Sequence, residues 1–179
     1  MISELLSNDR IIKSLKQLLD ACAAKSGVEI VSMVLYGSKA KGDRNSQNDY
    51  DIMLLLKDGT ALANFIRFNE ALKIEIIKEK LLQVKFLTYT PDTFEDIMYN
   101  DSTVGTYFYI ICKENLILYD KFGAFSAIKE KLQRNERKDE EEFLMQCIEF
   151  ARMMGSEKWE RKWEKALMQY RYFKKRRTT

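Results

Sequence analysis

Two aspartates stand at the head of an apolar run. Asp49 and Asp51 are two positions apart, and Asp51 leads directly into Ile52–Leu56. Side chains alternate along a strand, so we expect both carboxylates to point to the same side. Converging carboxylates suit Mg²⁺, which keeps several waters and takes further ligands from substrate phosphates. Asp49 alone is compatible with a simple turn, but a carboxylate at the mouth of a buried strand is costly without a partner, which favours a functional role for Asp51.

The segment before these aspartates is suited to phosphate. Gly37-Ser38 breaks the preceding apolar stretch, and backbone N–H groups around such a turn, together with the Ser38 hydroxyl, form a nest for anions. Lys39, Lys41 and Arg44 can add positive charge around a polyphosphate. The alternative is a solvated loop that happens to carry lysines. Combined with the aspartates, the turn predicts phosphoryl or nucleotidyl transfer from a nucleoside triphosphate.

Composition excludes several other chemistries. The 179-residue chain contains no histidine, which excludes His-based triads and His-ligated zinc. Cys22, Cys112 and Cys147 are far apart, so we expect core residues rather than a zinc site or a disulfide framework. The net charge of +3 is too small to argue for nucleic acid by itself. No apolar run could span a bilayer, and the acidic start at residues 1–4 is unlike a secretory signal, so we expect a cytoplasmic protein.

The loop at Gly37 needs a strand on each side. The β-branched stretch Val28–Tyr36 predicts the first strand, and Tyr50–Leu56 predicts a second one buried in the middle of a sheet. Apolar spacing and capping residues further predict helices at 9–25 and 61–80, a strand at 82–89, a helix capped by Thr90 and an edge strand at 116–119. A helix is also expected at 103–112, although the periodicity there is compatible with a strand as well. This order predicts an α/β (α+β) domain at residues 1–121, with one mixed sheet backed by helices.

Residues 122–179 are expected to form a C-terminal helical segment with a charged connector at 134–142. Two apolar stripes predict its helices, namely Phe143, Cys147, Phe150, Ala151 and Met154, and then Trp159, Trp163, Ala166, Leu167 and Tyr170. We interpret the aromatic stripe as core or as the contact of a homodimer rather than a ligand cage. For the basic end at 174–177, a helix terminus whose cations suit the macrodipole is favoured over a nucleic-acid-contacting tail.

The motif between the first two strands resembles a known family. Gly37-Ser38, a basic loop containing alanine, Gly42, and Asp-x-Asp-Ile at 49–52 are similar to the DNA polymerase β-like nucleotidyltransferase superfamily. Within it, residues 9–121 most resemble the minimal nucleotidyltransferase (MNT) domains of bacteria and archaea. The resemblance implies a polymerase-β-palm-like fold. It also implies Mg²⁺-dependent transfer of a nucleoside monophosphate from ATP or another NTP to a hydroxyl of a protein tyrosine, a small molecule or an RNA end.

The same resemblance assigns roles to residues and names a class of partner. It implies that Gly37 and Ser38 contact the β- and γ-phosphates and that Asp49 and Asp51 hold the metal ions. Relatives often act beside a separate helical HEPN protein in toxin–antitoxin pairs, so a HEPN-like partner is a family-level analogy. Residues 122–179 are too few to be a fused HEPN domain.

Lys85 departs from the family pattern, which implies a third carboxylate at this place. In one interpretation Lys85 is a counter-ion that replaces a metal, leaving a nucleotide-binding or antitoxin-like module without turnover. In another, Asp49 and Asp51 hold one Mg²⁺ while Lys85 contacts the triphosphate or acts as a base with lowered pKa. A third shifts the acid to Glu75 or Glu79, which both fall in an expected helix. Asp49, Asp51 and Lys85 are thus the candidate catalytic residues.

Overall fold

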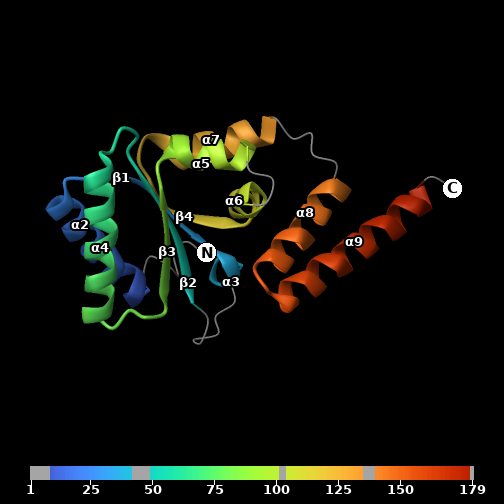
Figure 1. Ribbon diagram of the computed structural model, residues 1–179, viewed down its shortest axis with the longest axis horizontal. Coiled ribbons are helices and arrows are strands. Elements are labelled where there is room, and N and C mark those ends of the chain that lie inside the picture. Colours follow the sequence, from blue (N-terminus) through green and yellow to red (C-terminus); the bar gives the residue numbers. More distant parts are fainter. Residues whose placement is uncertain (1–8, 42–48, 101–103, 135–139, 178–179) are drawn as a thin grey trace. The chain divides into compact units, whose positions relative to one another are not determined.

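The computed structural model describes residues 9–41, 49–100, 104–134 and 140–177 (Figure 1). The chain divides into two compact units. The first comprises Met1–Thr93 with Lys113–Glu130, and the second comprises Phe94–Cys112 with Lys131–Thr179. The two domains expected from the sequence, residues 1–121 and 122–179, stay a prediction.

A four-stranded sheet with the order β3-β2-β1-β4 lies at the centre of the first unit (Figure 1). Its strands are β1 (Ile30–Tyr36), β2 (Tyr50–Leu56), β3 (Val84–Tyr89) and β4 (Asn115–Asp120). β1 is antiparallel to both β2 and β4, whereas β3 is parallel to β2. The sheet is therefore mixed, as predicted, with β2 inside it and β4 at an edge. Ile52–Leu56 are fully buried, which explains why that strand is apolar on both faces.

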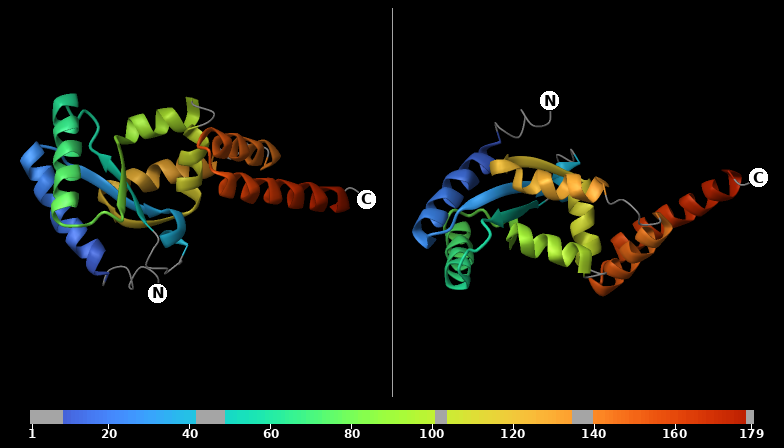
Figure 2. Two further views of the ribbon diagram at one scale, coloured as in Figure 1. Left: turned by 60° about the horizontal axis from the view of Figure 1, so that its bottom comes forward. Right: turned by 90° about the horizontal axis from the view of Figure 1, so that it is seen from above.

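Two long helices cover one face of this sheet (Figure 2). They are α2 (Arg10–Ser26) and α4 (Leu62–Lys78), and their buried side chains join those of β1 and β2 in one core of seventeen residues. The Asp9 carboxylate accepts hydrogen bonds from the backbone N–H groups of Ile11 and Ile12, and Gly27 ends α2 with φ +67°. Asp9 and Gly27 thus cap the two ends of α2.

The remaining helices follow the predicted order along the chain. They are the four-residue α3 (Gly37–Ala40), α5 (Pro91–Asn100), α6 (Val104–Lys113), the 3-10 turn η1 (Lys121–Gly123), α7 (Ala124–Arg134), α8 (Glu140–Met153) and α9 (Glu157–Arg177). The Thr90 hydroxyl accepts a hydrogen bond from the backbone N–H of Thr93, which confirms the predicted cap of α5. All three cysteines are buried, as predicted. Within the described ranges, no helix has the length and apolar character needed to cross a membrane.

The helical segment of the second unit carries its own small core. Leu144 and Ile148 of α8 pack with Leu167 of α9, and Trp163 and Tyr170 lie against them. The prediction that Met154 continues the apolar stripe of α8 is wrong. The helix ends one residue earlier, and Met154 is 62% exposed because Gly155 turns the chain with φ +63°. Of the expected charged connector, residues 135–139 lie outside the described part.

Candidate functional site

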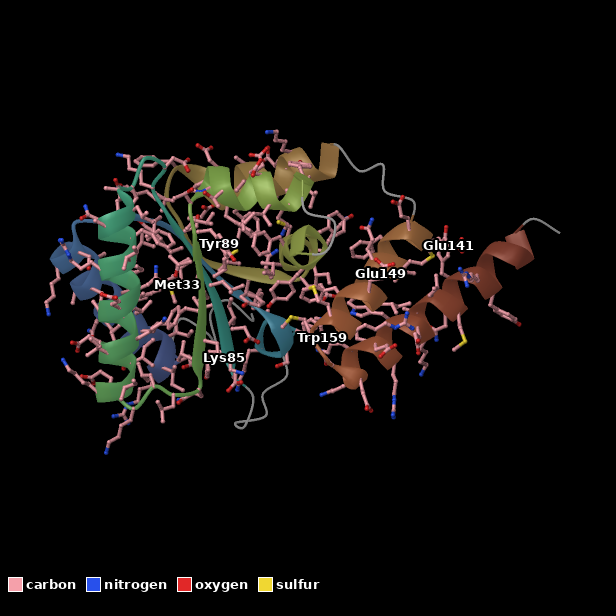
Figure 3. The ribbon with its side chains drawn as sticks, viewed as in Figure 1. Met33, Lys85, Tyr89, Glu141, Glu149 and Trp159 are labelled. Carbon is pink, nitrogen blue, oxygen red and sulfur yellow. The ribbon has the colours of Figure 1, made fainter. Side chains whose placement is uncertain are left out.

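The predicted site lies where three strands of the sheet come together (Figure 3). Tyr36, the last residue of β1, pairs with Asp51 at the start of β2. On its other side Asp51 pairs with Lys85 of β3. The chain turns away at Gly37 directly after β1, so the sheet itself brings the turn, the aspartate and the lysine together.

A side chain has no room at Gly37, the first residue of this turn. Its φ is +74°, and an ideal Cβ would stand 2.5 Å from Oδ2 of Asp51. A left-handed φ disfavours any residue with a side chain, and such close approach forbids one. The requirement for glycine thus comes from Asp51 as well as from the backbone.

Burial and the neighbouring charges act on the pKa of Asp51 in opposite directions. Its carboxylate is half-buried, and burial raises its pKa, while the Lys85 ammonium lowers it and the Asp49 carboxylate raises it further. Among the described residues it accepts no hydrogen bond. A desolvated carboxylate without donors is poised to gain from a cation.

Lys85 forms an ion pair with Asp49, with 2.5 Å between Nζ and Oδ2. The hydrogen bond to Asp49, together with the charges of Asp49 and Asp51, raises the pKa of Lys85. That direction is opposite to the lowered pKa that the interpretation of Lys85 as a base requires. Because the lysine side chain is 65% exposed, solvent screens the pair, and such pairs contribute only about 0–1 kcal/mol. The pair can therefore open at little cost.

The predicted phosphate-binding cations do not all gather at the turn. Nζ of Lys39 lies 4.9 Å from the ring centroid of Tyr50, and Lys41 is ion-paired with Glu114. Arg44 lies outside the described residues. Ser38 is half-buried in α3. The sequence did not predict that Glu114 lies beside the site, because no local pattern links Glu114 to Lys41.

Tyr50 ties the start of β2 to the start of α2. Its hydroxyl donates a 2.8 Å hydrogen bond to Oδ2 of Asp9, and burial together with that bond raises the pKa of Tyr50 to about 12. The phenol therefore stays protonated at neutral pH and keeps donating. This bond fixes the strand between the two candidate metal-binding aspartates.

Among the described residues, no further carboxylate joins Asp49 and Asp51. Within the ranges that the structure describes, there is no group of three or more His, Cys, Asp or Glu side chains placed to hold a metal ion. Glu75 is paired with Lys78 at 2.7 Å and, with Glu79, lines a cavity of about 470 Å³ between α2 and α4. The interpretation that either glutamate supplies the third acid is therefore wrong.

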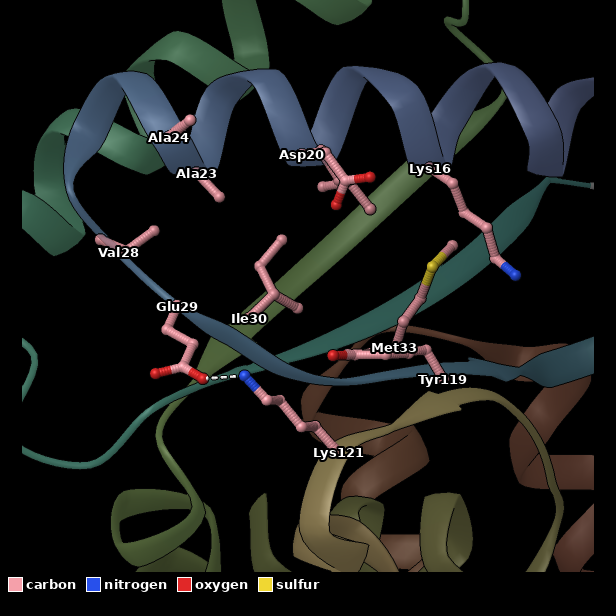
Figure 4. A pocket seen from close by; sticks show the side chains of 11 residues that line it. Lys16, Asp20, Ala23, Ala24, Val28, Glu29, Ile30, Met33, Tyr119 and Lys121 are labelled. Atoms are coloured by element: carbon pink, nitrogen blue, oxygen red, sulfur yellow. Dashed lines mark hydrogen bonds and ion pairs between the residues drawn. The ribbon is translucent and has the colours of Figure 1, made fainter.

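A second hollow of about 460 Å³ lies between α2 and the strands β1 and β4 (Figure 4). Its lining includes Met33, Lys16 and the ion pair of Glu29 with Lys121. None of the predicted site residues lines it, and Glu29 stands at the opposite end of β1 from Gly37. It is therefore separate from the predicted site.

Comparison with known proteins agrees with this geometry. A family model described as a nucleotidyltransferase domain matches residues 15–119. The match includes all four strands and the Gly-Ser turn between β1 and β2. No curated protein shows a significant match to the chain.

Proposed function

The chain belongs to the nucleotidyltransferase domain family, and from this premise we propose that it transfers a nucleoside monophosphate from ATP or another NTP to a hydroxyl group with the help of Mg²⁺. The observation that supports this most is the half-buried Asp51 carboxylate, which stands against Gly37 and has no hydrogen-bond donor among the described residues. Acceptors of the proposed transfer are a protein tyrosine, a small molecule or an RNA end, and the proposed location is the cytoplasm.

The donor set fits one Mg²⁺. Asp49 and Asp51 would hold it, and waters and substrate phosphates would complete its octahedral shell. Bound there, the ion would neutralise phosphate charge and polarise a phosphoryl oxygen. Lys85 must release Asp49 first, which the exposure of their ion pair permits.

The chain's own residues divide the work of the proposed transfer. Gly37 leaves open the space that a side chain would fill, so that backbone N–H groups and the Ser38 hydroxyl can donate to the β- and γ-phosphates. The acceptor oxygen bonds to the α-phosphorus as the bond to the bridging oxygen breaks and pyrophosphate leaves. Lys85, whose pKa is raised, stays protonated and cannot take the acceptor's proton. The proton passes to water, which predicts slow turnover.

The ion pair between Lys85 and Asp49 also favours a second candidate function. If Lys85 serves as a permanent internal cation in place of the metal, the domain is a nucleotide-binding or antitoxin-like module that acts by binding a partner, a HEPN-like protein among the candidates. This candidate predicts nucleotide binding that does not depend on Mg²⁺.

Both candidates are tested with purified protein and α-labelled ATP, and with each of the other labelled NTPs, with and without Mg²⁺ and with cell extract as the source of acceptors. Binding and label transfer are measured for the unmodified chain, Asp51→Asn and Lys85→Asp, with Lys158→Asp as a control on an exposed lysine of α9. Transfer that needs Mg²⁺ and Asp51 supports the enzyme. Metal-independent binding without transfer, with transfer gained in Lys85→Asp, supports the binding module. Absence of any nucleotide binding would overturn both.

A further inference from the structure

The outward face of α4 carries four large apolar side chains beside the exposed charges of Arg67, Glu70, Lys73 and Lys78. Leu62 is 73% exposed, Ile66 48%, Ile74 52% and Ile77 65%. The helix buries its opposite face through Phe68 and its neighbours in the core under the sheet. Soluble domains rarely leave such large apolar side chains together in solvent, and where they do, the surface usually binds a partner.

Two unpaired charges lie inside this apolar face. Ile66, Glu70, Lys73 and Ile77 follow one another at steps of four, three and four residues, which is the spacing of a coiled-coil seam. Glu70 and Lys73 are both exposed, and neither has an ion-pair partner among the residues that the structure describes. We call these four residues the α4 seam.

The α4 seam is complementary to itself in one orientation. Glu70 and Lys73 share their midpoint in the helix with Ile66 and Ile77, between Ala71 and Leu72. If two copies of α4 lie antiparallel about that point, Glu70 faces Lys73 of the partner subunit and Ile66 faces Ile77 of the partner subunit. In a parallel pair, Glu70 would face Glu70 of the partner subunit, and like charges would repel.

We propose that the α4 seam binds the α4 seam of a second copy of this chain in an antiparallel, two-fold symmetric dimer. The interface is isologous, so each contact occurs twice. The buried Glu70–Lys73 pairs set register and orientation, and the isoleucines supply the apolar area. The proposal concerns the face opposite the sheet and is independent of the proposed function.

The size of the seam sets the strength of the dimer. Seventeen residues of helix span about 25 Å, so one helix pair buries less than the roughly 1,600 Å² of a standard interface. We therefore expect a weak dimer with a Kd of about 10 µM, on the scale of transient complexes. The average mass in solution should rise with concentration from 21.1 kDa toward twice that value.

The test uses two charge reversals and their mixture. Glu70→Lys and Lys73→Glu each place like charges across the seam, and we expect the Kd of each variant alone to rise at least about tenfold in analytical ultracentrifugation. Mixed in equal amounts, the two variants restore both opposite-charge pairs, and we expect a heterodimer with a Kd within about threefold of the unmodified chain. Recovery on mixing also shows that neither variant is misfolded. Lys158→Glu, on α9, is the control and should leave the Kd unchanged.

Three outcomes would overturn the proposal. The first is a monomer at all concentrations up to several hundred micromolar, which would leave the apolar face to another partner. The second is a dimer that neither charge reversal weakens, which would place the contact elsewhere or make it parallel. The third is a pair of weakened variants that do not associate on mixing, although circular dichroism shows both folded.

Discussion

At the scale of single residues, the site depends on how Gly37 and Asp51 share one small space. The carboxylate occupies the volume that any Cβ at Gly37 would need, and the backbone there has a left-handed φ. The steric clash and the backbone strain can be measured separately, because Gly59 has nearly the same φ, +77°, but nothing lies within 4 Å of its ideal Cβ. The pair of glycines therefore offers a matched comparison of strain with and without a clash.

We predict that Gly37→Ala destabilises the protein more than Gly59→Ala and alone abolishes nucleotide binding. Both substitutions force alanine to a left-handed φ at a cost of about 1–2 kcal/mol. Only the first also displaces the Asp51 carboxylate, so its total loss should reach about 2–4 kcal/mol. Urea unfolding and the binding of labelled ATP measure the two effects. Equal losses for the two variants would contradict the role given to Asp51.

We expect the Asp51 carboxylate to lower the stability of the fold while it serves the proposed binding of Mg²⁺. Because its pKa is raised, mainly by burial, its charged form disfavours folding above that pKa, and the penalty disappears as the pH falls through it. We predict that Asp51→Asn loses Mg²⁺-dependent binding yet raises Tm at pH 7.5 by about 1–3 °C. Thermal unfolding at pH 7.5 and pH 3.5 should show that gain shrinking at the acidic value. A lower Tm at pH 7.5 would contradict the prediction.

At the scale of elements, Asp120 joins three pieces of the first unit. It ends β4, accepts hydrogen bonds from the Ser32 hydroxyl of β1 and the Ser126 hydroxyl of α7, and accepts further bonds from the backbone N–H groups of Phe125 and Ser126 at 2.9 and 3.0 Å. Burial alone would raise the pKa of Asp120, but these bonds outweigh it and lower the pKa. The carboxylate thus anchors the start of α7 to the sheet.

We predict that Asp120→Asn lowers the free energy of unfolding at pH 7 by about 1–3 kcal/mol, since the charge-assisted bonds weaken. A lowered pKa means that the stabilisation is present above the unfolded value near about 3.9 and is lost as the pH falls through the folded value. Urea unfolding should therefore show the difference between the two proteins shrinking below about pH 4. Asp20→Asn, on the exposed face of α2, serves as the control and should change little at any pH.

At this scale, the elements that could be predicted from the sequence were those whose signals lie close together in the chain. The apolar run at Tyr50–Leu56 and the Thr90 cap predicted β2 and α5 because their signals lie within a few residues. A counter-ion role for Lys85 was also among the expectations, because the family resemblance places Lys85 where a third carboxylate is implied, beside Asp49 and Asp51. The bond between Ser32 and Asp120 joins positions 88 residues apart, and no local pattern announces it. The prediction for Met154 was wrong although its signal was local. The apolar spacing continues to Met154, but α8 ends at Met153, just before the turn at Gly155.

At the scale of the whole molecule, two clusters of buried side chains in the described residues differ greatly in size. Seventeen buried residues form the core under the sheet, whereas three form the core shared by α8 and α9. Buried apolar area is the main source of stability, so the sheet should resist denaturant longer than the α8–α9 hairpin. Both tryptophans of the chain, Trp159 and Trp163, lie in α9, so tryptophan fluorescence reports on that hairpin and on the contact of Trp159 with Tyr107 of α6.

We predict that the chain unfolds in two stages. Tryptophan fluorescence should change at a lower urea concentration than the loss of hydrogen-exchange protection in β2, measured by mass spectrometry on peptides covering residues 50–56. Two cavity-forming variants separate the stages. Leu167→Ala should shift only the fluorescence transition and Leu54→Ala mainly the exchange transition, each by about 2–4 kcal/mol. Coincident transitions that move together in both variants would instead show one cooperative unit, and the two cores would then have to be treated as a single structure in which the helical hairpin stabilises the sheet that carries the site.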